Sequence, residues 1–234
     1  MNYLYLLLNI GSIAIPFAFS FHPKLKFYKH WKSSLIAILI SATIFIVWDV
    51  LFTKNGVWGF NETYLLGINI INLPIEEWLF FLCIPYACIF THYSLIVCYP
   101  NLGLNKNITR YVAIALIIFF LIVAVFNIDK NYTFINFAVA GIILTLVLLS
   151  NKKLLQQYFL TYLVIFIPFL LVNGILTGSF IENEVVWYNN SENLGMRIFT
   201  IPIEDAVYAF SLILIPLSIM KKIESPDIKG LEII

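Results

Sequence analysis

Long apolar segments, separated by short polar or turn-forming breaks, follow one another along the chain. The hydrocarbon core of a bilayer is about 30 Å thick, and a helix needs roughly 20 residues to cross it. Seven segments have about that length, so the sequence predicts an all-α membrane protein with seven transmembrane helices. The predicted helices cover residues 3–21, 33–52, 74–98, 108–126, 132–149, 154–176 and 200–220.

Basic residues are concentrated in every second segment that connects the predicted helices. Lys and Arg are retained on the cytoplasmic side of membrane proteins. If the N-terminus lies outside, eleven of the fourteen basic residues fall in inner segments, and only Lys54, Lys130 and Arg197 fall outside. The pattern therefore predicts an integral membrane protein with an outer N-terminus and a cytoplasmic C-terminus.

Short motifs that contain polar residues recur in the same order in two groups of three predicted helices. The third segment opens LPIEEWLFFLCIP and the seventh opens IPIEDAVYAFSLILIP, at an offset of 128 residues. The second segment ends WDVLFT and the sixth ends VNGILT, at an offset of 124 residues. The first segment starts YLLLN at Tyr5, and the fifth starts YTFIN at Tyr132.

This recurrence predicts two parallel three-helix repeats joined by a connector helix, a 3+1+3 arrangement. The first half would comprise residues 1–100, the connector 101–130 and the second half 131–234. Apolar helices rich in Ile, Leu and Phe also resemble one another by chance, so the inference depends on the polar residues.

The overall composition excludes several classes of protein. Hydrophobic residues make up 61% of the chain and charged residues 12%, whereas globular proteins have about 25% charged residues. Membrane lipid is therefore an expected partner. The 14 basic and 13 acidic residues nearly balance, which argues against a nucleic-acid partner. Three cysteines without metal-ligand spacing are interpreted as packing thiols, and no metal site is predicted.

Five carboxyl groups lie near the outer ends of the predicted helices. Acidic residues in membrane spans are costly and usually face the interior of a helix bundle, where they serve a function. The candidate catalytic residues are Asp49, Glu76, Glu77, Glu204 and Asp205.

Two interpretations of these acids compete. Pro74 and Pro202 would occupy the first turn of their helices, so the acids behind them could simply interact with the positive end of a helix dipole. Burial and mutual repulsion would instead keep some of the carboxyls protonated. Because the acidic pair recurs with its proline, and Asp49 lies at the same depth, the sequence favours a functional site in which acid and base roles are divided.

Aromatic and amide side chains near the acids are candidates for binding a substrate. Tyr208 lies one helical turn from Glu204, and Asn173 stands where Asp49 would recur in the second half. Contact with lipid and an interfacial aromatic belt are the alternative explanations for the aromatic residues. The candidate substrate-binding residues are Trp48, Phe80, Phe81, Tyr208 and Asn173.

The chain resembles the integral-membrane lycopene cyclases of bacteria, archaea and fungi in three segments, NLPIEEWLFF, TIPIEDAVYAF and VWD. The resemblance covers essentially the whole chain and implies a fused two-half cyclase, in a prokaryotic cell membrane, acting on lycopene or a related acyclic carotenoid. It also implies that the two acidic pairs match the family's acidic motif. The expected reaction is an acid-catalysed, carbocation-mediated isomerisation that forms β-rings without redox chemistry. No cofactor is expected, because a Gly-rich dinucleotide motif is absent.

Three other functions remain alternatives. A proton-coupled transporter would use buried carboxyls as a relay, but it predicts acids along the whole membrane path rather than in one layer. A retinal-binding photoreceptor requires a lysine in the last helix, and residues 200–220 contain none. A carotenoid hydratase would form the same cation and capture it with water.

Overall fold

The computed structural model describes residues 3–225, which form seven α-helices. Residues 226–234, which belong to the predicted second half, lie outside the described part of the chain, as do residues 1–2. The helices are α1 (Leu4–Phe19), α2 (Trp31–Lys54), α3 (Ile75–Cys98), α4 (Lys106–Phe126), α5 (Asn131–Ser150), α6 (Lys152–Leu176) and α7 (Ile203–Ile223).

Six of these helices, α2 to α7, are long and apolar enough to span a membrane. The helical membrane protein predicted from the sequence is thus confirmed, and the helix boundaries agree with the predicted ones to within about three residues. The exception in length is α1, which has 16 residues and is about 24 Å long. It ends at Phe19, where the hydroxyl of Ser20 donates to the carbonyl of Pro16 and the chain turns away before Pro23.

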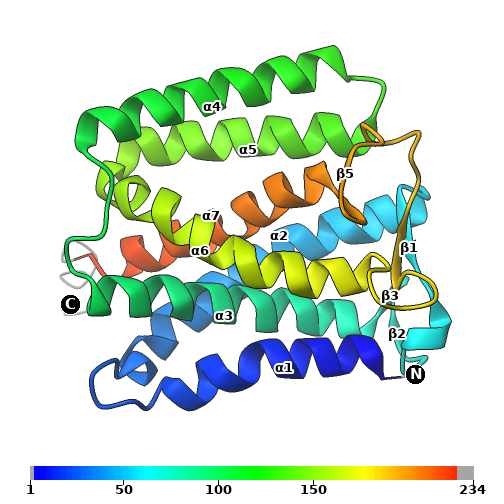
Figure 1. The fold of residues 1–234 in the computed structure, drawn as a ribbon, viewed down its shortest axis with the longest axis horizontal. Coiled ribbons are helices and arrows are strands. Elements are labelled where there is room, and N and C mark those ends of the chain that lie inside the picture. The colour runs from blue at the N-terminus through cyan, green and yellow to red at the C-terminus, as the bar shows by residue number, and fades with distance from the viewer. Residues whose placement is uncertain (1–2, 226–234) are drawn as a thin grey trace, which may run out of the picture.

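The helices lie roughly along the long axis of the molecule, in a layered bundle (Figure 1). The first helix packs against α3, and α5 packs against α7. The second helix contacts both α3 and α7, whereas α4 lies on the outside against α5. Their contacts bury an aromatic core that includes Phe137, Tyr158 and Phe210.

Short strands, which the all-α prediction did not include, form three antiparallel pairs at one end of the bundle (Figure 1). Two are tight hairpins that lead directly into α3 and α7. Pro74 and Pro202 end these hairpins and occupy the N-cap positions of α3 and α7, so they precede the first helical turn in which the sequence predicts them. The strands are β1 (Trp58–Phe60), β2 (Asn69–Ile70), β3 (Leu73–Pro74), β4 (Val186–Tyr188), β5 (Arg197–Ile198) and β6 (Ile201–Pro202), with 3-10 turns at Phe27–His30 and Glu62–Tyr64.

The third pair joins two loops that are distant in sequence. Strands β1 and β4 pair with Gly59 opposite Trp187. A side chain at Gly59 would meet the indole ring of Trp187, so glycine allows that ring to lie over the strand. This small sheet covers the end of the bundle where α3 and α7 begin (Figure 1).

Candidate active site

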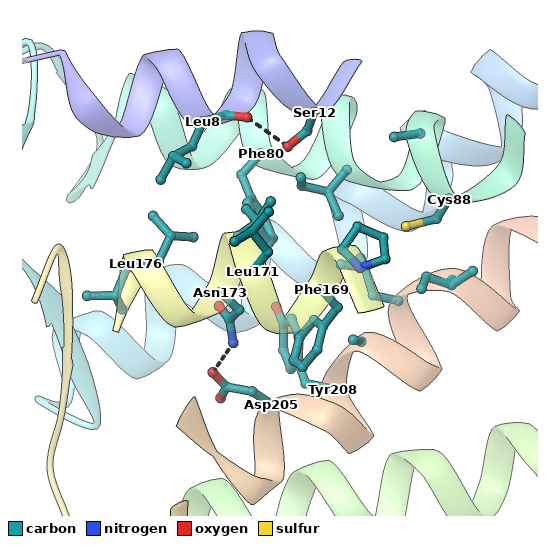
Figure 2. Close-up of a pocket in the computed structure, with 18 of the residues that line it drawn as sticks. Leu8, Ser12, Phe80, Cys88, Phe169, Leu171, Asn173, Leu176, Asp205 and Tyr208 are labelled. Carbon is teal, nitrogen blue, oxygen red and sulfur yellow. Dashed lines mark hydrogen bonds between the residues drawn. The ribbon is translucent and has the colours of Figure 1, made fainter. Parts of the chain in front are cut away.

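An elongated apolar cavity of about 540 Å³ lies among the helices, beneath the β1–β4 sheet. Its wall comes mainly from α1, α3, α6 and α7 (Figure 2). Strands β1 and β4 add four residues, and α2 and α5 add one each. Three of the five predicted acids line it, one from each of α2, α3 and α7. They are Asp49, Glu77 and Asp205.

Asp205, in the first turn of α7, is surrounded by hydrogen-bond donors. Tyr132 donates its hydroxyl to Oδ1 at 2.5 Å. Asn173 donates its amide to Oδ2 at 2.7 Å (Figure 2), and Tyr188 donates its hydroxyl to the same oxygen at 3.0 Å. Burial, followed by the nearby charge of Asp205, raises the pKa of Tyr188 well above its ordinary value, so this phenol remains a neutral donor.

Glu77, in the first turn of α3, has fewer fixed donors. The hydroxyl of Tyr5 donates to Glu77 Oε2, and the carboxyl of Asp49 adjoins that of Glu77. The indole N–H of Trp58 donates to Asp49 Oδ1, as does the hydroxyl of Thr53 at 3.2 Å. The second oxygen of Asp49, Oδ2, is buried and accepts from no N–H or hydroxyl donor among residues 3–225.

The other two predicted acids, Glu76 and Glu204, are buried but do not line the cavity. Glu76 Oε1 accepts the backbone N–H of Leu66 at 2.6 Å. Glu204 Oε1 accepts the backbone N–H of Leu194 at 2.8 Å and the hydroxyl of Thr133. These carboxyls therefore hold the loops ahead of α3 and α7 in place.

The two sides of the site repeat the same contacts. Tyr5 contacts Glu77 in the way that Tyr132 contacts Asp205. The amide of Asn9 donates to the carbonyl of Glu76 at 2.8 Å, and that of Asn136 donates to the carbonyl of Glu204 at 2.6 Å. We call the first set the Glu77 side and the second the Asp205 side.

Three of the five predicted substrate-binding residues, Phe80, Asn173 and Tyr208, line the cavity (Figure 2). The other two support its wall from behind. The ring of Trp48 lies 5.2 Å from that of Tyr208, and the ring of Phe81 lies 5.6 Å from that of Phe80. Both residues are buried but do not face the cavity.

Four aromatic residues that were not predicted as site residues donate to the cavity carboxyls: Tyr5, Trp58, Tyr132 and Tyr188. Tyr5 and Tyr132 begin the matched segments YLLLN and YTFIN, so the repeat contained a signal for both. Trp58 and Tyr188 lie in loops, where an interfacial aromatic residue gives the same pattern, and nothing in the sequence distinguishes the two roles.

No basic side chain among the described residues forms an ion pair with a cavity carboxyl. Within residues 3–225 the one ion pair joins His30 and Glu224, beyond the opposite ends of the helices. Arg197, one of the three basic residues predicted on the outer side, donates to the carbonyl of Thr200 and the side-chain oxygen of Asn190, and its guanidinium lies 6.0 Å from the ring centre of Tyr188. The three cavity carboxyls therefore lie in an apolar space with polar donors but without a compensating positive charge.

Comparison with known proteins identifies the family of the chain. The lycopene cyclase family matches residues 2–95 and 129–223, which together form most of the sequence. A bifunctional lycopene cyclase/phytoene synthase of Aspergillus niger is 33% identical over 89 residues, a segment that covers 36% of this chain and 15% of the fungal protein. No solved structure matches the chain. The chain belongs to the lycopene cyclase family.

Proposed function

We propose that this protein is a lycopene cyclase, which closes β-rings at the ends of lycopene or a related acyclic carotenoid. The observation that carries the proposal is a set of three carboxyls at one end of an elongated apolar cavity, in a chain of the lycopene cyclase family. An apolar cavity suits a hydrocarbon substrate, and buried carboxyls supply the proton chemistry that ring closure requires.

The reaction proceeds by gain and loss of one proton. A carboxylic acid protonates the terminal double bond of the substrate and leaves a tertiary carbocation. The neighbouring double bond attacks this cation, which forms the six-membered ring and moves the positive charge onto the ring. A carboxylate then removes a ring proton and restores a double bond. Atoms and electrons balance without a redox partner, so the reaction is a net isomerisation.

The walls of the cavity favour the cationic intermediate. The rings of Trp58, Tyr132 and Tyr208 lie close together, with ring centroids 5.1 Å apart for Trp58 and Tyr132. Aromatic faces attract cations, and an anionic carboxylate stabilises them further. The β1–β4 sheet, which contributes Trp58 and Tyr188, covers the cavity and limits the water that would capture the cation.

The proposed enzyme has the 3+1+3 layout, with halves at 1–100 and 131–234 and a connector at 101–130. The paired contacts of Glu77 with Tyr5 and of Asp205 with Tyr132 support this layout. All seven helices cross the membrane, including the short α1, with the N-terminus outside and the C-terminus in the cytoplasm. The carboxyls then lie at the level of the outer leaflet.

Substrate enters sideways from the bilayer, between α1 and α6. The cavity-lining residues that are exposed all belong to these two helices. They are Leu7, Gly11 and Ile15 on α1, and Pro168 and Leu171 on α6. An opening bordered by apolar side chains suits a chain dissolved in lipid, with one end group at the carboxyls and the remainder in the membrane.

Gly11→Phe is expected to slow conversion of lycopene by at least about tenfold. No atom of the cavity lies within 4 Å of a Cβ at Gly11, so a large side chain there fits without strain and obstructs the opening. The matched control is Gly11→Ala, which adds one methyl group and should retain normal conversion. Conversion by each variant is measured from carotenoid extracts of cells that contain equal amounts of the membrane-inserted protein. Equal conversion by both variants would contradict entry between α1 and α6.

The proposed activity is tested by expressing the chain alone in cells that accumulate lycopene. We expect β-ringed carotenoids in the extracts, identified by chromatography and absorption spectra. Unchanged lycopene in cells with well-inserted protein would refute the proposal. Hydroxylated acyclic products would instead identify a hydratase, in which water captures the same cation.

A further inference from the structure

We infer that the two sides of the site have different roles: the Asp49–Glu77 pair holds and recovers the catalytic proton, whereas Asp205 remains an anion that stabilises the carbocation. The inference rests on the proposed function and assigns to each carboxyl of that site its part in the reaction.

On the Glu77 side, two carboxyls adjoin in a buried space, and no basic side chain of the described residues forms an ion pair with either. Ionised carboxylate oxygens only accept hydrogen bonds, so two adjoining carboxylates repel each other. One proton shared between the two carboxyls removes this repulsion. Oδ2 of Asp49, which accepts from no N–H or hydroxyl group, is a buried oxygen on a cavity-lining residue, so it can hold the shared proton and pass it to a substrate.

On the Asp205 side, an amide occupies the corresponding position. Asn173 is the counterpart of Asp49 in the matched segments VNGILT and WDVLFT, and its N–H donates to Asp205 at 2.7 Å. With the hydroxyls of Tyr132 and Tyr188, both oxygens of Asp205 accept from neutral donors. Donors directed at both oxygens favour the ionised form of a carboxyl. Among residues 3–225, no second carboxyl is hydrogen-bonded to Asp205 and able to share a proton with it.

With these roles, the Asp49–Glu77 pair both gives the proton at the start of the reaction and takes one back at the end. Donation breaks an O–H bond of the Asp49–Glu77 pair and forms a C–H bond at the terminal double bond of the substrate. The ring carbon that later loses a proton is two bonds from the protonated carbon, so the pair, now fully ionised, can take up that proton. The pair is thereby restored, and Asp205 changes neither its charge nor its bonds.

Infrared spectroscopy of the purified protein without carotenoid tests the assignment. Protonated carboxylic acids give a C=O stretching band that ionised carboxylates lack. We expect Asp49→Asn to remove the intensity of one protonated carboxyl, because Glu77 then ionises opposite an amide. Asn173→Asp is expected to add the same intensity, since a second carboxyl pair is created. Asp205→Asn should leave the band unchanged, because the group removed is ionised.

Ring formation provides the second readout. Asp49→Asn should lower it at least about 100-fold through loss of the acid. Asn173→Asp should lower it about 100-fold, because the proton shared with the new carboxyl and the loss of the Asn173 donor weaken the negative charge on Asp205. An unchanged band in Asp49→Asn, or a lost band in Asp205→Asn, would overturn the assignment even if the enzyme cyclises lycopene. Failure of the proposed function would appear separately, as an absence of ring formation in the wild-type protein.

Discussion

Replacing Glu77 by Gln is expected to lower ring formation by about 10²–10⁴-fold, the usual contribution of a general acid. This loss corresponds to about 2.7–5.4 kcal/mol of activation free energy. The amide retains an oxygen for the hydroxyl of Tyr5, so the helix contact between α1 and α3 survives. It cannot give a proton to a double bond, and its presence ends proton sharing with Asp49. Initial rates in membranes that contain equal amounts of each protein measure the effect.

The matched control is the adjacent residue. Glu76 is also buried in the first turn of α3, but it accepts the backbone N–H of Leu66 and does not line the cavity. Glu76→Gln keeps an oxygen for that N–H, so ring formation should remain within about tenfold of normal. Similar losses in both variants would mean that the loop ahead of α3, rather than the acid, limits the reaction.

The sequence could not predict that Glu77 lines the cavity whereas Glu76 does not. Helix positions followed from apolar length, and the acids were located because charges are rare in membrane spans. A repeated Pro-Ile-Glu-acid motif does not reveal which acid of each pair faces the cavity. That depends on the rotation of α3 and α7, which the contacts of Glu76 and Glu204 with the preceding loops fix.

The loops themselves were the least predictable part of the site. Two- and three-residue strands are too short to give a period-two pattern, so the β1–β4 pairing has no sequence signature. Trp58 and Tyr188 nevertheless reach the carboxyls because these strands fold over the cavity. Tyr5 and Tyr132 could have been identified, since they recur at equivalent positions and polar recurrence was the signal used for the acids.

Asp205→Asn is expected to lower the turnover rate by about 10²–10³-fold, the typical cost of removing a group that stabilises charge in the transition state. The anion interacts with the carbocation but gains little from an uncharged hydrocarbon. The loss should therefore appear in kcat, with little change in KM, because the apolar cavity provides most of the binding. Glu204→Gln is the matched control, since its oxygen still accepts from Leu194 and Thr133.

The distribution of the loss between kcat and KM distinguishes the possible roles of Asp205. A raised KM with normal kcat would make it a residue that only shapes the cavity, through the hydrogen bonds that it accepts from Tyr132, Asn173 and Tyr188. Tyr132→Phe removes one of these donors while the charge remains, so it should cost much less than Asp205→Asn. If the two variants lost activity equally, the aromatic and amide contacts, rather than the negative charge, would be what the reaction requires.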